Sequence, residues 1–383
     1  MAPANGPDWD SNTGDNVNTD ESIAMPAGRH GDSNLHHVEF YVADAEAVAA
    51  DLAAGYGFQR VGAADLPGGC RSVAIRNGRA TLILTSATDD AHPVARYVEA
   101  HGDGVASIAL RVGDATAARR DAVDRGARPA VTATHLAHAP GCVITEIHTF
   151  GDVTQRFVEL PAEAEEGAIP WLRATAPATP TPTGVQLHEI DHIAICLPGG
   201  DLARTVAFYE SALGYPVVFE ERTEVGGQVM NSKVVKEPGG ALTLVLVEPG
   251  HLSGEPGQVE KFVKANGGAG VQHLAFATAD IVRTVDQLRG NGIAFLTTPA
   301  AYYELTHERL ASGRHAIEDL RRLHILADVD QSGKLFQIFA RSTAPRGTYF
   351  MEIIERDGAT TFGSGNIRAL YDAVEMGQRG QDR

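Results

Sequence analysis

The apolar positions of the chain follow two periods, and the same succession of periods occurs twice. Residues 35–61 and 190–219 each begin with an apolar strand-like run, continue with helical spacing and end at a Gly-aromatic turn into a further strand. In the second segment, Leu202, Val206 and Leu213 recur near the helical period. Short segments with apolar alternation follow, such as NSKVV and ALTLVLVEP, and these are typical of half-buried strands. The pattern predicts βαβββ units.

Two more pairs of segments match each other in the same order. Residues 102–118 pair with 268–285, and residues 154–161 pair with 348–355. Matches that keep their order and similar spacing indicate an internal duplication. We therefore predict an α+β chain of four βαβββ units that form two open-barrel domains, with helices outside curved sheets. Because neighbouring residues of a strand face opposite sides, a side chain on such a strand can project into the concave face.

A stretch rich in Pro, Ala and Thr separates the two halves at residues 161–187. This composition is typical of a linker, and Trp171 is expected to dock it on one half. The N-terminal stretch MAPANGPDWDSNTGDNVNTDES is acidic and polar, which predicts disorder and no signal peptide. The expected segments are a disordered tail (1–32), an N-terminal structural barrel domain (33–162), a linker (163–187), a C-terminal catalytic barrel domain with a closing helix (188–376) and a second disordered tail (377–383).

Charge and composition exclude several classes of protein. Lys and Arg total 32 and Asp and Glu total 49, which gives a formal net charge of −17. This balance argues against a nucleic-acid binder and against a polybasic membrane-surface protein. The chain has no apolar run of about eighteen residues, so we expect no transmembrane helix. The cysteines Cys70, Cys142 and Cys196 lack CxxC spacing, which is typical of a reducing compartment and indicates a cytoplasmic protein.

Three polar residues interrupt strongly apolar strands in the second half. His192 lies in IDHIAICL, His273 in GVQHLAFA and Glu352 in TYFMEIIER. An imidazole or carboxylate inside an apolar strand is costly unless it is bonded to something. Two imidazoles and one carboxylate, with other positions left open, are the ligands of non-haem iron(II) oxygenases. The set contains no thiolate, which argues against a structural zinc site.

A single histidine on an apolar strand is more often a satisfied core residue than a ligand, so the interpretation depends on all three residues together. The competing carboxylate is Glu355, which faces the opposite side of its strand and is expected at the surface or in a salt bridge with Arg356. In the first half, the positions that match the three ligands are His37, Ser107 and Glu159. The middle imidazole is missing there, so we expect the first half to be structural.

At these residues the sequence resembles the 4-hydroxyphenylpyruvate dioxygenase family. The resemblance runs from about residue 35 to 376 and is densest in GGAGVQHLAF, LFQIFARSTAPRGTYFMEIIER, FGSGNIRALYDAVE and MNSKVV. It implies the vicinal-oxygen-chelate fold, with Fe(II) as the cofactor and His192, His273 and Glu352 as its ligands. It also implies 4-hydroxyphenylpyruvate and O2 as substrates and suggests a homodimer.

The resemblance also assigns residues to the substrate. The family's substrate contacts correspond to Ser232, Gln258, Gln272 and Gln337. Amide and hydroxyl groups there would orient a 2-oxo acid and its phenol, although turn or surface polarity is an alternative, strongest for Gln258. Phe339, Phe350 and Phe362 are candidate walls for the aromatic ring, and core packing accounts for each of them equally well.

Two products are open within the family: homogentisate, from attack on the ring, and 4-hydroxymandelate, from oxidation of the benzylic carbon. Relatives that form homogentisate carry an aromatic residue where this chain has Ile367, and a Pro and an Asn where it has Val245 and Val247. A smaller side chain and a lost polar contact would let the ring shift. We therefore favour a hydroxymandelate synthase that supplies peptide-antibiotic biosynthesis. Neutral drift at any one of these positions, and a homogentisate-forming enzyme of tyrosine catabolism, remain the alternatives.

Two other classes share this fold. A non-catalytic small-molecule binder would have lost the ligands, and all three are present. An extradiol catechol dioxygenase would use the same triad, but the FGSGN and LFQIF segments argue against it. The last predicted element is a helix over 364–376, whose stripe of Ile367, Leu370, Tyr371 and Val374 is expected to lie over the barrel mouth and exclude water.

Overall fold

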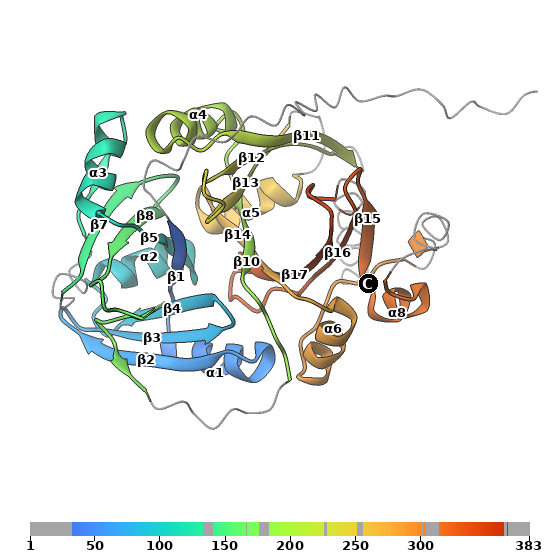
Figure 1. The fold of residues 1–383 in the computed structure, drawn as a ribbon, viewed down its shortest axis with the longest axis horizontal. Helices are drawn as coiled ribbons and strands as arrows, with labels where there is room; N and C mark the ends of the chain where they lie inside the picture. Colours follow the sequence, from blue (N-terminus) through green and yellow to red (C-terminus); the bar gives the residue numbers. More distant parts are fainter. Residues whose placement is uncertain are drawn as a thin grey trace, which may run out of the picture.

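The protein is described here from a computed structural model, which shows two curved sheets side by side (Figure 1). The terminal tails, most of the predicted closing helix and part of the linker lie outside the described residues. No helix in the described part of the chain is long and apolar enough to span a membrane. The structure describes residues 33–132, 141–165, 167–175, 184–225, 228–250, 256–299, 302–303, 314–363 and 366.

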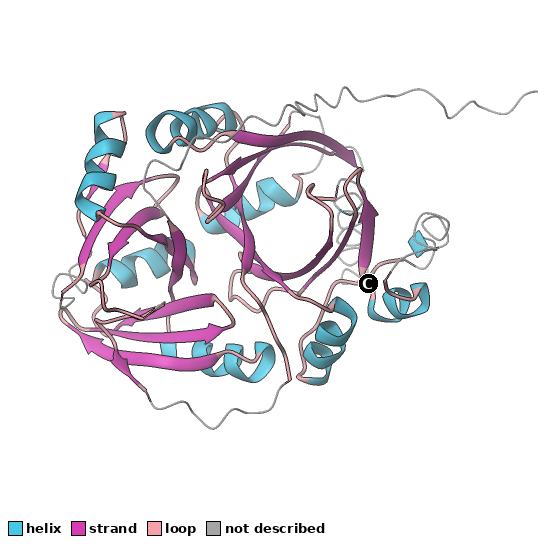
Figure 2. Cartoon of the chain, in the orientation of Figure 1, coloured by secondary structure: helices cyan, strands magenta, loops and turns pink. Residues whose placement is uncertain are grey.

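The N-terminal sheet has nine strands in the order β6-β7-β8-β5-β1-β4-β3-β2-β9. The helices α1 and α3 lie on the outside of the sheet, whereas α2 is seen within its curve (Figure 1 and Figure 2). The elements are β1 (Asn34–Tyr41), α1 (Ala45–Tyr56), β2 (Gln59–Leu66), β3 (Cys70–Asn77), β4 (Ala80–Ala87), α2 (Pro93–His101), β5 (Gly104–Arg111), α3 (Ala115–Asp124), β6 (Pro129–Ala130), β7 (Val143–His148), β8 (Thr154–Glu159) and β9 (Arg173–Ala174).

The C-terminal sheet has eight strands in the order β11-β12-β13-β10-β14-β17-β16-β15 and curls into an open barrel. The elements are β10 (Ile190–Cys196), α4 (Leu202–Phe208), a π-helical turn η2 (Tyr209–Leu213), β11 (Val217–Val225), β12 (Gln228–Lys236), β13 (Thr243–Pro249), α5 (Gln258–Asn266), β14 (Gly270–Ala277), α6 (Ile281–Gly290), α8 (Ile317–Leu323), β15 (Leu326–Val329), β16 (Lys334–Phe339) and β17 (Phe350–Asp357).

The strand order confirms the predicted duplication into four βαβββ units. When the C-terminal strand order is read backwards, from β15 to β11, it repeats the order of the first eight N-terminal strands. In this correspondence β10 matches β1, and β17 matches β8. β1 pairs in parallel with β4 as β10 does with β13, and β5 pairs in parallel with β8 as β14 does with β17. Both sheets also shift register at the same place, between Leu35 and His37 and between Ile190 and His192.

Local sequence signals explain where the helices begin and end. Asp44 caps α1 by accepting hydrogen bonds from the backbone N–H groups of Glu46 and Ala47. The two predicted Gly-aromatic turns follow helices, and Gly57 and Gly214 adopt left-handed backbone angles with φ of 72° and 75°. Glycine is favoured there because it carries no Cβ. The chain can therefore leave each helix directly into the next strand.

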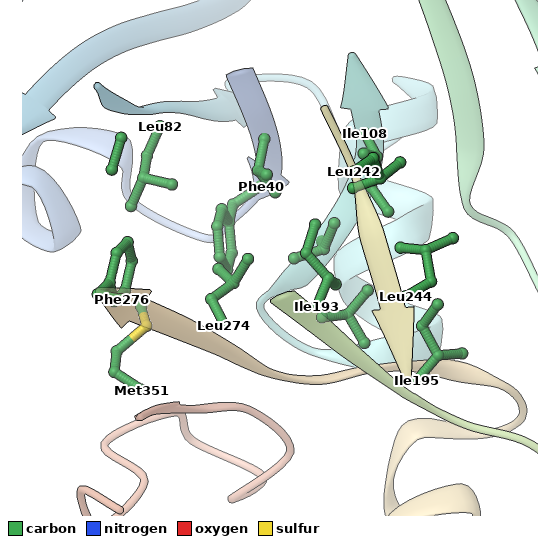
Figure 3. Packing of buried hydrophobic residues seen from close by; sticks show 14 of the residues in the cluster. Phe40, Leu82, Ile108, Ile193, Ile195, Leu242, Leu244, Leu274, Phe276 and Met351 are labelled. Carbon is green, nitrogen blue, oxygen red and sulfur yellow. The ribbon is translucent and has the colours of Figure 1, made fainter. Parts of the chain in front are cut away.

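The central strands of the two sheets pack against each other through their outer faces, as Figure 3 shows. Ile193 and Ile195 of β10 point into this shared core together with Phe40 and Ile108 of the N-terminal sheet. Neighbouring residues of a strand face opposite sides, so His192 and Ala194 point toward the concave side of the C-terminal barrel. The interdomain core thus sets which face of β10 lines the interior of the C-terminal barrel.

Two further contacts complete the architecture. Trp171 is 7% exposed and packs on the N-terminal sheet, where β9 also pairs with β2, so this part of the expected linker docks on the first half. In the second half, Val259 and Phe262 of α5 pack against Cys196 and Met230. Both of these lie on strand faces that line the barrel, so α5 closes one end of it.

Candidate metal centre and substrate cavity

The predicted ligands come from three neighbouring strands, β10, β14 and β17, at the centre of the C-terminal sheet. Ala275 of β14 is opposite His192 on one side and opposite Glu352 on the other. His273 lies two residues from Ala275 and therefore on the same face of the sheet. The structure thus brings together three residues that are far apart in the sequence.

The ligand atoms of these residues converge on one point. Glu352 Oε2 lies 3.4 Å from His192 Nε2 and 3.2 Å from His273 Nε2, and the three ligand atoms lie within 4.8 Å of one another. The side chain of Glu352 is 1% exposed and those of His192 and His273 are 4% and 13% exposed. Two imidazole nitrogens and one carboxylate oxygen at these separations suit a single divalent transition-metal ion with positions left for other ligands.

Further side chains orient the three ligands. His192 Nδ1 lies 2.8 Å from Asp191 Oδ1, and because a carboxylate only accepts, Nδ1 carries the proton and Nε2 is free for a metal. Arg356 holds the same carboxylate through Nε and Nη2, at 2.8 and 2.9 Å. Gln337 Nε2 donates to Glu352 Oε1 over 2.8 Å, which leaves Oε2 facing the two imidazoles.

The electrostatics of the three candidate ligands favour one proton shared among them. Burial acts most strongly on Glu352, but the two imidazoles outweigh it and hold the pKa of this carboxyl at about 2. Burial also opposes protonation of His192, yet the carboxylates of Glu352 and Asp191 raise its pKa to about 9. The pKa of His273 is lowered, chiefly by burial. A cation bound between the ligands would therefore replace the proton on His192 Nε2.

The Asp191–Arg356 pair lines a cleft of about 990 Å³ between the two domains. Phe362 lines the same cleft, and its ring centre lies 5.3 Å from that of His192 and 5.1 Å from the guanidinium carbon of Arg356. Phe362 therefore packs beside the metal ligands, in the direction of the cleft. Sequence reasoning missed Asp191 and the role of Arg356; an acidic residue directly before a candidate ligand was the available signal.

The predicted substrate residues on β12 and β13 face the concave side of the C-terminal barrel. Ser232 is opposite Val247, and Val245 is opposite Ala194, which shares the face of His192. The hydroxyl of Ser232 donates to the backbone carbonyl of Glu221 over 3.3 Å. Ser232 is buried, whereas the two valines are half-buried. The inner face of β13 therefore carries apolar side chains at Val245 and Val247, the two positions where homogentisate-forming relatives are expected to carry Pro and Asn.

Two predicted aromatic residues surround the second imidazole. The ring of Phe350 stacks on that of His273 at 5.0 Å between centres, and Phe339 approaches the same ring at 6.0 Å. Gln272, also a predicted contact, places its Oε1 3.3 Å from His273 Nδ1. The two phenylalanines thus form an apolar surface immediately beside the candidate metal centre.

Gln337 belongs to a hydrogen-bonded chain that reaches the end of the described residues. Its Oε1 accepts from Asn366 Nδ2 over 2.9 Å, and Asn366 Oδ1 accepts from the hydroxyl of Tyr302 over 2.9 Å. The chain links the carboxylate of Glu352 to Asn366, which lies within the predicted closing helix (364–376). Ile367 lies outside the described residues. The last predicted contact, Gln258, is the first residue of α5.

One predicted equivalence is wrong. Glu159 was expected at the place of Glu352, but the register shows that Arg156 stands there: it is opposite Ala109, as Glu352 is opposite Ala275. The error is a shift of three residues along the strand, and the register places Glu159 at the position that Glu355 holds in the second half. Ser107 and His37 do hold the places of His273 and His192.

Arg156 brings a cation of its own to the N-terminal barrel. Its Nη1 lies 2.7 Å from Glu39 Oε2 and its Nε lies 2.6 Å from Glu146 Oε1, with all three side chains buried. His37 Nε2 lies 3.2 Å from the same Nη1. The guanidinium thus occupies the centre at which the C-terminal barrel collects its candidate metal ligands, which agrees with a structural first half.

The structure also corrects the expectation for Glu355. It is 3% exposed rather than at the surface, and its Oε2 lies 2.9 Å from His315 Nε2 and accepts from the backbone N–H of Ile281 over 2.6 Å. With Asp280, these groups form a second cluster close enough to hold a metal. However, Glu159 accepts from the backbone N–H of Ala115 in the same way in the first half. The burial of the Glu355 carboxylate is therefore explained by its hydrogen bond to the start of α6, which holds that helix against the sheet.

Comparisons with known proteins agree with this geometry. The family model of the Glyoxalase/Bleomycin resistance protein/Dioxygenase superfamily matches residues 189–319, which include both candidate histidines. A 4-hydroxyphenylpyruvate dioxygenase of Aspergillus fumigatus is 31% identical, over 89% of this chain and 92% of that protein. The enzyme of the same name from Danio rerio is 28% identical over 90% of each chain.

A solved structure is closer in sequence. A triple mutant of 4-hydroxymandelate synthase from Streptomyces coelicolor is 39% identical and superposes with a TM-score of 0.76, covering 90% of this chain and 99% of the other. Two barrels of duplicated βαβββ units are therefore a shared architecture, and the fold is the expected vicinal-oxygen-chelate fold.

Proposed function

Since the chain belongs to the 4-hydroxyphenylpyruvate dioxygenase family, we propose that it is an iron(II)-dependent dioxygenase that acts on 4-hydroxyphenylpyruvate. The observation that carries the proposal is the convergence of His192, His273 and Glu352 on one buried point. A non-catalytic binder has no need for three buried ligand atoms that must share a proton whenever no metal is bound. Family membership likewise favours a 2-oxo acid over a catechol as the substrate.

The role of the protein is to hold the metal and to aim the substrate. Iron(II) held here would supply the redox chemistry for oxidative decarboxylation of the 2-oxo acid by O2. Asp191 keeps the Nε2 of His192 free for the metal, and Gln337 keeps one oxygen of Glu352 turned toward it. Phe350 and Phe339 place an apolar surface beside this centre, against which an aromatic ring can be held.

We propose 4-hydroxymandelate and CO2 as the products, with a role in hydroxyphenylglycine supply for peptide antibiotics. Val245 and Val247 leave the cavity wall without the polar contact expected in homogentisate-forming relatives. A ring that is less tightly fixed can bring its benzylic carbon, rather than its ring carbon, to the reacting centre. The 39% identity to a hydroxymandelate synthase variant supports this choice.

Homogentisate is the second candidate product, because the curated relatives from Aspergillus fumigatus and Danio rerio carry the name 4-hydroxyphenylpyruvate dioxygenase. The two products are isomers, so chromatography against both standards is the deciding measurement. The protein is incubated with iron(II), ascorbate and 4-hydroxyphenylpyruvate. We expect 4-hydroxymandelate as the main product and none from Glu352→Gln. Homogentisate as the main product rejects the proposed selectivity, and no O2 uptake rejects the dioxygenase.

A further inference from the structure

At one end of the C-terminal barrel, three polar side chains that come close together have buried atoms without a hydrogen-bond partner among the residues that the structure describes. The atoms are Glu221 Oε2, Thr223 Oγ1 and Gln258 Nε2. Most buried polar atoms of native proteins are hydrogen-bonded, and an unpaired one is destabilising. Two acceptors and one amide donor left unpaired in one region suggest that a bound molecule completes them.

Glu221 and Thr223 point into the barrel from β11. Glu221 is opposite Ser232 and Thr223 is opposite Met230, and both partners are buried. The residues of β11 that alternate with them are exposed, so the two faces of this strand are clearly separated. Met230 also packs against Val259 of α5. The two unpaired acceptors therefore lie toward the end of the barrel that α5 closes.

Gln258 begins α5 at the same end. The residue before it, Gly257, lies so close to β12 that an added Cβ would stand 2.6 Å from Gln228 Oε1. Gln228 is two residues from Met230, the partner of Thr223. The first turn of α5 is therefore beside the β11–β12 pair, which brings the amide of Gln258 near the two acceptors.

This polar end lies beyond the candidate metal centre, deeper in the barrel. On β10, Ala194 is opposite His273. Cys196 lies two residues further along the same strand and is opposite Val247, which is in turn opposite Ser232. Two residues of a strand span about 7 Å. A molecule bound to the metal by one end can therefore reach Glu221 with a group at the far side of a phenyl ring.

The N-terminal barrel shows how the same positions look without a ligand. Ser72 takes the place of Ser232, and its hydroxyl lies 2.8 Å from that of Thr85, which donates to Glu39 over 2.6 Å. Ala64 stands where β11 has Glu221. Apart from the hydroxyl of Ser107, the buried polar side chains that the structure describes along these strands have hydrogen-bond partners. Unpaired acceptors near the α5-closed end thus distinguish the second barrel.

We propose that Glu221 binds the phenol hydroxyl of the substrate, with the amide of Gln258 as a second partner. The proposal deepens the function proposed above and rests on it. A phenol hydroxyl donates one hydrogen bond and accepts another, which matches a carboxylate oxygen and an amide N–H. The bond to the carboxylate is charge-assisted and therefore strong. Glu221 holds the ring by its far end and so sets which carbon lies nearest the metal.

The test compares 4-hydroxyphenylpyruvate with phenylpyruvate, which lacks only the hydroxyl. For Glu221→Gln and Glu221→Met, we expect kcat/KM with 4-hydroxyphenylpyruvate to fall about 10- to 100-fold, the usual effect of losing a hydrogen bond to a charged group. The value with phenylpyruvate should change about 2-fold or less. Anaerobic calorimetry on the metal-loaded protein measures the same selectivity as dissociation constants, without turnover.

Glu220→Gln is the matched control, because Glu220 is the neighbouring exposed carboxylate and pairs with Lys233 outside the barrel. It should leave both substrates unaffected. An equal loss on both acids, or no loss with the hydroxylated one, overturns the role of Glu221. If the unaltered protein binds both acids but consumes no O2, the proposed function fails, and calorimetry still decides whether Glu221 recognises the hydroxyl.

Discussion

Arg156 stands in the N-terminal barrel at the position that Glu352 holds in the C-terminal barrel. Each is opposite an alanine of the neighbouring parallel strand, Ala109 for Arg156 and Ala275 for Glu352. One barrel therefore points a guanidinium at two buried carboxylates, and the other points a carboxylate at two imidazoles. The duplicated fold thus carries a built-in cation in its first half and a set of candidate metal ligands in its second.

Removing the built-in cation should destabilise the protein. Arg156→Met leaves Glu39 and Glu146 buried without a counter-charge, and breaking a buried ion pair in this way typically costs about 3–5 kcal/mol. We expect a loss of that size in the free energy of unfolding, measured with urea. Because both carboxylates cause the loss, the triple variant Glu39→Leu, Glu146→Leu, Arg156→Met should recover most of it. The exposed Arg120 provides the control substitution, Arg120→Met, which should change little. Unchanged stability in Arg156→Met would contradict this account.

Asp191→Asn should weaken metal binding without emptying the site. The amide retains the size of the side chain but loses the charge that fixes the orientation of His192, while Arg356 loses its partner. Loss of such a supporting group typically lowers metal affinity about 10- to 100-fold. Competition with a chelator measures the affinity. Glu189→Gln, at a residue that pairs with Arg79 at the surface, serves as the control. Equal affinities in all three proteins would argue that Asp191 has no such role.

The metal-free protein should show one histidine that titrates far above the usual range. The folded-state pKa of His192 is raised from 6.5 to about 9. The protonated form therefore contributes stability that is present in full below about pH 6.5 and is lost as the pH rises through about 9. NMR of the imidazole carbons, assigned with His192→Gln, gives the pKa directly. Metal should abolish this titration because it binds the neutral ring. A midpoint near 6.5 in the metal-free protein would refute the prediction.

Substitutions in the cavity wall should redirect the product. Val247→Asn restores a polar group on the concave face opposite Ser232, and Ile367→Phe restores an aromatic ring at a position predicted from the sequence. Both changes should hold the substrate ring more tightly and raise the fraction of homogentisate, with the largest increase in the double variant. Product ratios by chromatography measure the effect. Val218→Asn, at an exposed position on β11, is the control. A ratio that stays constant in all variants speaks against a steric origin of selectivity.

The sequence by itself determined the duplication and pointed to the three candidate metal ligands. A strand alternates its faces with a period of two, and His192, His273 and Glu352 each interrupt an apolar strand, so their chemistry was visible before any contact was known. The Gly-aromatic turns were visible for a similar reason, because a left-handed residue after a helix favours glycine. These properties depend on residues close together in the chain.

Tertiary structure decided everything that depends on register and on distant partners. It placed Arg156 rather than Glu159 at the first barrel's centre, and it paired Arg356 with Asp191 rather than with Glu355. It also turned Glu221 toward the interior of the barrel, with a buried carboxylate oxygen that has no hydrogen-bond partner among the described residues. The physical reason is that a shift of register hardly changes the pattern of one strand, whereas it changes which side chains of neighbouring strands meet. Only the packed sheet selects among those alternatives.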